Sequence, residues 1–414
     1  MDTLPLSHNR NRILDRAACR IAAAFALACF AVALSGQVRI IDPPAGPDSG
    51  MPFLAASSRG VYMSWLEPAA SGQHSLKVAE WTAERWSTPG TIAFGPNWFI
   101  NWADFPSIIE TTHGMLAHWL TRTGPGKWGY GIRFGMAETF DKPWHETYTV
   151  GLMNPDDYSG FVSFVSTRDS VGAAYLAPPV SGRGRSEAEQ EIKTLRFVDF
   201  RADGSALDDE ELDSDVCTCC QTAVAMTAEG VIVVYRDHLQ GEIRDISTVR
   251  RVRGAWTSPH LVHRDGWRIN GCPSDGPSIA ASGDRVAVAW LTRAQDRPRI
   301  QLSFSTDSGR TFIDPVRIDD GSPLGRVSLA NLDRDSVVAC WIEKTGDATA
   351  QIRLKQVSRS SGAQSSITVA SVPASRAVGL PKIAILADRI IVAWRDSRVR
   401  AAWLPLSELT GAGK

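Results

Sequence analysis

The stretch that decides the fold is VAVAW (residues 286–290), a short apolar run that ends in an aromatic residue. Runs of this kind, with β-branched and aromatic residues, are typical of strands buried on both faces. Their last residues lie 51 to 60 positions apart, and a repeat of about fifty residues predicts a propeller or a solenoid array. The six other runs are VYMSW to Trp65, MLAHW to Trp119, VGAAY to Tyr175, VIVVY to Tyr235, VVACW to Trp341 and IIVAW to Trp394.

Each repeat contains further strand-like segments around its aromatic run. An apolar stretch such as GPSIAAS (276–282) comes before the run, and an alternating stretch such as RIQLSFS (299–305) follows it. Four strands per repeat, repeated radially, make a β-propeller blade. We therefore predict an all-β fold, a single propeller over residues 37–404 with seven four-stranded blades, and six blades as the alternative.

The two ends of this pattern are complementary. The last repeat stops after its third strand, RVRAAWL (398–404), and only a short tail, residues 405–414, follows. A strand-like segment, QVRIID (37–42), precedes the first complete repeat. We expect this segment to pair into the last blade, which closes the ring and leaves no free sheet edge.

Charge and the first residues bear on partners and location. The chain has 44 Lys and Arg against 45 Asp and Glu, a formal net charge of −1, so we expect no nucleic acid partner.

Arginines from Arg10 to Arg20 precede an uncharged run, residues 21–34, which is too short for a membrane span and typical of a signal peptide. We predict a signal peptide over residues 1–35 and export to the periplasm or the extracellular space, ahead of lipid attachment at Cys29 or an uncleaved anchor. We expect no other transmembrane segment, and a monomer.

One repeat carries a recognisable turn, STDSGRTF (305–312). It resembles the Asp box of bacterial neuraminidase repeats, which occurs in the sialidase-like propeller superfamily. In such a turn Asp307 accepts backbone N–H bonds, Gly309 supplies a positive φ and Phe312 packs over the sheet. The resemblance implies a structural role and says little about chemistry.

The middle of the chain carries a second resemblance, to exported bacterial propellers that are described as sialidase-like and have no established reaction. It rests on DVCTCCQT (215–222), VVYRD (233–237), EIRDI (242–246), DGW (265–267) and GCPSDGP (271–277). Catalytic sialidases grip the sugar carboxylate with three arginines and use a Tyr nucleophile paired with Glu and an Asp acid/base. They also carry an R-I-P motif near the N-terminus, which this sequence lacks, so these roles cannot be transferred residue by residue.

Ligand sites in propellers form at one end of the tunnel, where loops that enter the innermost strands meet loops that leave the second strands. Arginines from different blades could converge there on a carboxylate, sulfate or phosphate, because guanidinium binds oxyanions in a bidentate way. Alternatively, each arginine pairs with a nearby aspartate, and the tryptophans serve blade packing rather than sugar stacking. The candidate substrate-binding residues are Arg236, Arg326, Arg376, Trp102 and Trp267.

The candidate catalytic residues are Asp104, Asp237 and Tyr158, which lie in or beside these loops. A carboxylate there could act as a general acid, and a Tyr could act at the anomeric carbon of a sugar. The alternative is a turn role, because Asp before a strand often accepts bonds from backbone N–H groups.

Four cysteines, Cys217, Cys219, Cys220 and Cys272, lie in the entering loops of blades four and five. In an oxidising compartment they predict two disulfides, or one disulfide and a free pair. A thiolate site for Zn or Cu is the alternative, since four sulfurs complete a tetrahedral shell, and a Cys219–Cys220 bridge is the third possibility. Cys340 is expected to be an inert core thiol, and we expect no other cofactor.

Two functions follow from these observations. The first is an exported sialidase-like enzyme, a glycoside hydrolase in which arginines hold an acidic glycan. The second is a non-catalytic propeller that binds a ligand or partner at a tunnel mouth carrying a metal or disulfide cluster. The fold alone does not decide between them, because propellers host many unrelated functions. The resemblance to the sialidase-like superfamily favours the first.

Overall fold

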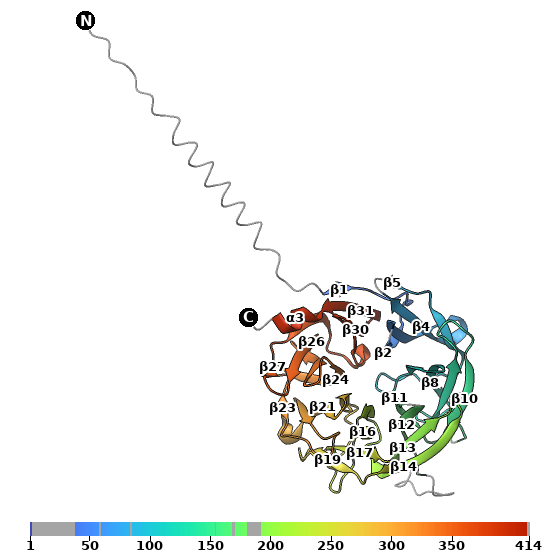
Figure 1. The fold of residues 1–414 in the computed structure, drawn as a ribbon. Helices are drawn as coiled ribbons and strands as arrows, with labels where there is room; N and C mark the ends of the chain where they lie inside the picture. The colour runs from blue at the N-terminus through green and yellow to red at the C-terminus, as the bar shows by residue number, and fades with distance from the viewer. Residues whose placement is uncertain are drawn as a thin grey trace. The chain divides into compact units, whose positions relative to one another are not determined.

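The computed structural model describes Met1 and residues 38–411, except residues 58, 83–84, 154, 168–169 and 180–191. Apart from Met1, the predicted signal peptide lies outside the described residues. Over residues 39–411 the described strands form seven antiparallel sheets, arranged radially around a central axis (Figure 1). The predicted all-β, seven-bladed propeller is therefore confirmed, and the six-bladed alternative is excluded.

The first three blades follow the chain in order. Blade one holds β2 (Gly50–Ala56), β3 (Val61–Pro68), β4 (His74–Thr82), β5 (Arg85–Trp86) and β6 (Gly90–Gly95). Blade two holds β7 (Ser107–Thr111), β8 (Gly114–Arg122), β9 (Tyr130–Ala137) and β10 (His145–Val150). Blade three holds β11 (Gly160–Ser166), β12 (Val171–Ala177), β13 (Lys193–Phe200) and β14 (Ala206–Val216).

The next three blades repeat this order. Blade four holds β15 (Ala223–Thr227), β16 (Gly230–Arg236), β17 (Ile246–Val252), β18 (Ala255–Trp256) and β19 (His260–His263). Blade five holds β20 (Ser278–Ser282), β21 (Arg285–Thr292), β22 (Arg299–Ser305) and β23 (Val316–Arg317). Blade six holds β24 (Pro323–Asn331), β25 (Ser336–Lys344), β26 (Thr349–Ser358), β27 (Gly362–Ala363) and β28 (Ile367–Pro373).

Blade seven combines both ends of the described chain: β29 (Lys382–Leu386), β30 (Arg389–Asp396), β31 (Arg398–Pro405) and β1 (Arg39–Ile40). Short helical turns are η1 (Ala70–Gly72), η2 (Ala294–Asp296) and η3 (Arg376–Val378). The segment expected to be a tail carries helix α3 (Leu406–Gly411). Among the described residues, no helix has the length and apolar character needed to span a membrane.

The repeated aromatic runs form the second strand of every blade, and their residues are almost entirely buried between neighbouring sheets. Their aromatic residues combine a buried ring with a satisfied polar group. Trp65 Nε1 donates to Glu67 Oε2 at 2.9 Å, and Trp290 Nε1 donates to Asp265 Oδ2 at 2.6 Å. In five blades, those of Trp65, Tyr175, Tyr235, Trp290 and Trp341, a large ring therefore fills the wedge between blades while its polar atom donates to a carboxylate.

The ring closes between β1 and β31, which pair in antiparallel fashion with Arg39 opposite Trp403. The side chain of Asp42 reinforces this closure. It accepts hydrogen bonds from Arg400 Nε at 2.8 Å and from the backbone N–H of Ala401 at 3.3 Å, and it pairs with Arg398 at 3.2 Å. The predicted closure by the N-terminal strand is confirmed, although the paired segment is short.

Two aspartates in entering loops connect each loop to the innermost strand of the next blade. Asp104 Oδ1 accepts the backbone N–H of Phe161 at 2.8 Å, and Asp275 Oδ2 accepts that of Arg326 at 2.8 Å. Phe161 directly follows Gly160, and Arg326 directly follows Gly325. Both residues adopt a positive φ, 58° and 61°. The carboxylates therefore hold a backbone conformation that L residues rarely adopt.

Gln221 makes a third connection of this kind. Its Oε1 accepts the backbone N–H of Gly276 at 2.8 Å, and its Nε2 donates to the carbonyl of Ala103 at 2.5 Å. The amide therefore joins the entering loops of blades two, four and five. We call the side chains of Asp104, Gln221 and Asp275 the loop clamps.

The turn at residues 305–312 has the geometry expected from its sequence. Asp307 Oδ1 accepts the backbone N–H of Thr311 at 2.9 Å, and Gly309 has a φ of 78°. Phe312 packs against a buried cluster that includes Trp290. The turn is thus held by its own side chains rather than by a ligand.

We predict that Asp42→Ala lowers the free energy of unfolding by about 1–3 kcal/mol, because it leaves the Ala401 N–H and two arginines without their acceptor. Asp388→Ala is the matched control. That carboxylate is 85% exposed and lies 3.8 Å from Arg389, so its loss should cost less than about 0.5 kcal/mol. Denaturant unfolding measures both. Equal stability of the two variants would contradict the importance of this closure.

Candidate functional site

A cavity of about 340 Å³ opens between blades one, two and seven. Its lining residues come from loops that enter innermost strands and from the ends of second strands, which is the tunnel end where we expected a site. We call it the mouth cavity. It is lined by residues 48 and 50–52, Leu66, Pro68, His74, Ile100, Trp102, Phe105, Ala377, Gly379, Leu380, Lys382 and Arg395.

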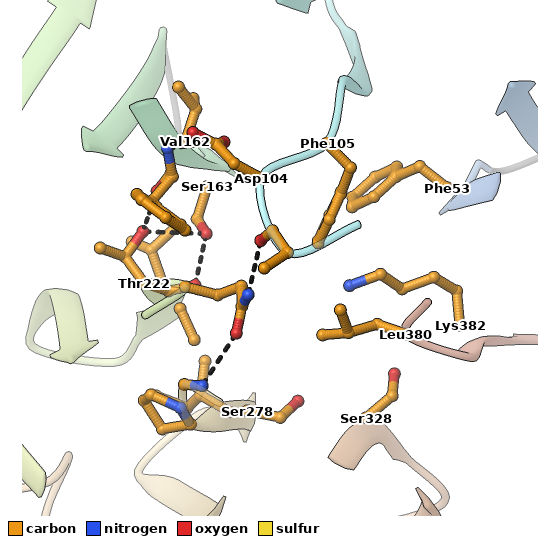
Figure 2. A pocket seen from close by; sticks show the side chains of 18 of the residues that line it. Phe53, Asp104, Phe105, Val162, Ser163, Thr222, Ser278, Ser328, Leu380 and Lys382 are labelled. Carbon is orange, nitrogen blue, oxygen red and sulfur yellow. Dashed lines mark hydrogen bonds between the residues drawn. The ribbon is translucent and has the colours of Figure 1, made fainter. Parts of the chain in front are cut away.

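A second cavity of about 170 Å³ lies in the channel, among the innermost strands. Figure 2 shows the hydroxyl side chains of Ser163, Thr222, Ser278 and Ser328 around it. We call it the channel pocket. Lys382, Phe105 and Leu380 line both cavities, so the two spaces meet at these residues.

Lys382 is the one cation that lines both cavities. Its amine points into the channel pocket (Figure 2), 4.1 Å from the ring centroid of Phe105 and 5.6 Å from that of Phe53. Among the described residues the amine has no hydrogen-bond acceptor and no carboxylate partner. Burial lowers the pKa of Lys382 to about 7. The sequence analysis missed this residue, although a lysine at the start of the innermost strand KIAIL breaks an otherwise apolar pattern.

Two of the three predicted arginines come together on Trp102. The guanidinium carbon of Arg326 lies 4.9 Å from the Trp102 ring, and that of Arg376 lies 5.8 Å from it. Arg326 is buried and donates to the carbonyl of Ser375 at 2.8 Å, and burial lowers its pKa. Arg376 is exposed. Trp102 thus lines the mouth cavity while two guanidinium groups lie against its ring.

Arg236 and Trp267 occupy a different position. Arg236 is buried and donates to the backbone carbonyls of Asp275, Arg244 and Leu291 at 3.0, 2.6 and 2.8 Å. Its guanidinium carbon lies 4.8 Å from the ring of the buried Trp267. Neither residue lines the mouth cavity or the channel pocket, so the three arginines do not converge on one point.

The predicted catalytic carboxylates are both engaged with protein donors. Asp104 is buried and accepts the Tyr130 hydroxyl at 2.9 Å besides the backbone bond described above, and its carboxylate points away from the open centre of the channel pocket (Figure 2). Burial raises the pKa of Asp104 to about 7. Asp237 accepts the Ser247 hydroxyl at 2.6 Å and the backbone N–H of His238 at 2.7 Å, and burial raises its pKa to about 6.

Tyr158 lies apart from both cavities. Its hydroxyl donates to the carbonyl of Thr218, its ring stacks on Tyr130 at 5.0 Å, and burial raises its pKa. Tyr158, Asp104 and Asp237 therefore do not assemble around one space. Their catalytic roles stay predictions, and we infer from their contacts that each positions a loop.

The cysteines form one disulfide and a free pair, which was one of the expected arrangements. Cys219 is bonded to Cys272, with their Cα atoms 5.9 Å apart, and this bridge joins the entering loops of blades four and five. Cys217 and Cys220 are free and buried, and their sulfurs lie 3.5 Å apart. The pKa of Cys217 falls to about 6 because Cys220 donates its S–H to it and Arg236 adds positive charge.

The remaining cysteine in the described residues, Cys340, is a free thiol buried in β25. Burial in these apolar surroundings raises its pKa. It lies in the core as expected. The Cys219–Cys220 bridge that we considered is not formed.

Comparison with solved structures identifies the same fold in other proteins. An ulvan lyase, described as a new family of polysaccharide lyase, superposes with a TM-score of 0.55 at 11% identity, over 91% of this chain and 99% of that chain. A second polysaccharide lyase gives 0.52 at 8% identity, over 90% and 98% of the two chains. NanB sialidase from Streptococcus pneumoniae gives 0.45 at 9% identity, over 90% and 94%. At these identities the likeness to the two lyases establishes the fold alone.

Comparisons of sequence give no such likeness. No protein-family model and no curated protein matches the chain. The chemistry of the site must therefore be argued from its own residues.

We predict that Asp104→Ala lowers the free energy of unfolding by about 2–4 kcal/mol, because the Tyr130 hydroxyl and the Phe161 N–H lose a buried acceptor. Lys382→Met is the comparison, since it removes a desolvated charge that has no carboxylate partner among the described residues and should leave stability unchanged or higher. Thermal unfolding of both variants tests this. A stable Asp104→Ala variant that binds a glycan but no longer converts it would restore the catalytic interpretation.

Proposed function

We propose that this protein is an exported, monomeric propeller that binds an acidic glycan in the mouth cavity. The observation that carries the proposal is Lys382, a largely buried amine that faces both cavities and has no carboxylate partner among the described residues. Keeping an unpaired cation in such a place costs free energy. A ligand that supplies a carboxylate or sulfate at this position would recover that cost.

The walls of the mouth cavity suit a sugar ring. Trp102 and Phe105 offer flat apolar surfaces, and aromatic side chains bind at low entropic cost because they have few rotatable bonds. Arg395 and His74 line the same space and add polar groups beside Lys382. A cavity of about 340 Å³ lies within the range of small-ligand sites, so it fits a terminal or single sugar unit of a longer chain.

The number of carboxylates that line the mouth cavity helps to decide between glycan hydrolysis and glycan binding. Asp48 is the only Asp or Glu among its lining residues, and it is exposed. Hydrolysis by the usual mechanism needs two carboxylates about 5–10 Å apart across the scissile bond. Binding of an acidic sugar needs no such pair, so it is the function that the geometry supports best. A solved ulvan lyase with this fold is described as bound to -[GlcA(1-4)Rha3S]-, which makes uronate-containing glycans the first ligands to test.

Export is part of the proposal and rests on two observations. The uncharged run at residues 21–34 follows a basic segment, and a disulfide joins two loops of the propeller. Disulfides persist mainly in oxidising compartments. A single chain that closes its own ring leaves no blade to be completed by a second copy, which favours a monomer.

We predict that Lys382→Met weakens binding of a uronate oligosaccharide by roughly thirtyfold or more, because a charge-assisted bond inside a cavity is lost. Lys344→Met is the matched control, since Lys344 lies at the surface and pairs with Asp347. Calorimetric titration with acidic and neutral oligosaccharides measures the effect. Equal affinity of the two variants would rule out Lys382 as the binding group.

Lys382 also favours a second candidate function, β-elimination. A neutral amine could take the proton from C5 of a uronate while the C4–oxygen bond breaks. The departing oxygen takes a proton from water and becomes the terminal hydroxyl of the shortened chain, and a C4–C5 double bond remains on the uronate. A base of this kind must be neutral at the working pH, and the lowered pKa of Lys382 allows it. Elimination would place the sugar carboxylate near Arg395 rather than on Lys382.

The pH dependence separates the two functions. If Lys382 only binds an anion, affinity should fall as the pH rises through about 7, because the amine loses its charge. If it is the base, the formation of unsaturated product, followed by ultraviolet absorbance, should rise over the same range. Lys382→Arg keeps a cation without a usable base, so it should bind and fail to eliminate. Absence of unsaturated product at every pH would leave binding as the function.

A further inference from the structure

Three sulfurs lie together beneath the surface of the tunnel mouth. The Sγ of Cys217 lies 3.5 Å from that of Cys220, and both lie 4.0 Å from that of Cys219. All three residues are buried. We call Cys217, Cys219 and Cys220 the sulfur cluster. It is the one group of three potential metal ligands found in the described part of the chain.

These separations match those of a metal–thiolate site. With bonds of about 2.3 Å, three sulfurs around one ion lie about 4.0 Å apart in a trigonal plane and about 3.8 Å apart in a tetrahedron. The observed distances of 3.5 to 4.0 Å need only small shifts to fit either arrangement. Soft thiolate ligands select soft ions, and Cu(I) accepts three sulfurs where Zn²⁺ usually requires four ligands.

The loop that carries the cluster is fixed on several sides. Tyr158 donates its hydroxyl to the carbonyl of Thr218, in the middle of the cluster. Gln221, directly after Cys220, bonds to the loops of two other blades. An ion would therefore find its ligands already in place and would not have to order a flexible loop.

One of the three sulfurs is engaged in the disulfide. Cys219 is bonded to Cys272, which is exposed, whereas the cluster is buried. In this state Cys219 cannot act as a thiolate ligand. The exposed sulfur of Cys272 gives reagents in solution access to a bond whose other end lies in the cluster.

We propose that the sulfur cluster binds one Cu(I) ion when the Cys219–Cys272 disulfide is reduced, and that formation of the disulfide by exchange with an external disulfide, which takes up the two electrons, withdraws one ligand and releases the ion. This site is separate from the mouth cavity and does not depend on the proposed glycan function. Cys272 acts as a latch because its bond to the Cys219 sulfur, which already lies in the cluster, prevents that sulfur from acting as a thiolate ligand.

The redox step balances with a dithiol as the reductant. One thiolate of the dithiol attacks the exposed Sγ of Cys272, a mixed disulfide forms, and Cys219 leaves as a thiolate. The second thiol of the dithiol then attacks the mixed disulfide, which releases Cys272 and oxidises the dithiol to its own disulfide. Two electrons pass to the protein, and Cys219 joins Cys217 and Cys220 as the third ligand. The positive charge of Arg236, which acts on Cys217, would offset part of the negative charge of the site.

Copper titration of the folded protein tests the proposal. The full chain, reduced with a dithiol under nitrogen and freed of reductant, should take about one equivalent of Cu(I) from a chromophoric chelator. The same protein with its disulfide intact should hold Cu(I) roughly a hundredfold more weakly. No copper uptake by the reduced protein would overturn the site, and equal uptake in the two redox states would overturn the latch.

Single substitutions separate the ligands from the latch. Cys217→Ser and Cys220→Ser should each lose Cu(I), whereas Cys340→Ser, which removes a buried thiol elsewhere, should keep it. Cys272→Ser should also keep Cu(I) after reduction, because three ligands remain. Loss of Cu(I) binding in this variant would show that Cys272 is a ligand. X-ray absorption at the copper edge of the wild-type protein covers the case in which a variant misfolds. Three sulfur neighbours are expected, and nitrogen or oxygen neighbours would overturn the assignment.

Discussion

The loop clamps set the geometry of the tunnel mouth. Each carries a buried side-chain oxygen that takes a backbone N–H from the loop of another blade, and such bonds are worth most where water is excluded. The residues of interest lie beside them: Trp102 precedes Asp104, the sulfur cluster precedes Gln221, and Cys272 precedes Asp275. The loop clamps therefore fix the backbone next to the mouth cavity and the sulfur cluster.

The fold was predictable from the sequence because its signal is periodic. Seven runs of similar length and the segment at residues 37–42 determine the blade number and the closure, since burial of each run requires a neighbour on both faces. The turn at residues 305–312 was predictable for a similar reason, as Asp307 and Gly309 act within a few residues of their own position. Structural features that depend on local or repeated residues can therefore be predicted from the sequence.

The candidate site was harder to predict because its chemistry depends on distances across blades. Arg236 and Asp104 have residue types and loop positions that suit a ligand, yet backbone groups far away in the chain occupy them. Lys382 interrupts an apolar strand in the sequence, but only the folded ring shows that its amine lacks a carboxylate partner among the described residues. The cysteine loops were correctly placed as neighbours, but the choice of Cys219 as the partner of Cys272 needed coordinates.

The closure of the ring also constrains how the protein is made. Asp42 accepts the backbone N–H of Ala401 across the closure, and the two residues are 359 positions apart. The first strand of the propeller can therefore pair only after the last strand has formed. A nascent chain can stack six blades while a wedge of apolar surface stays uncovered on both sides of the gap. The apolar surface beside the gap is therefore covered only when β31 and β1 have met, so aggregation before ring closure competes directly with folding.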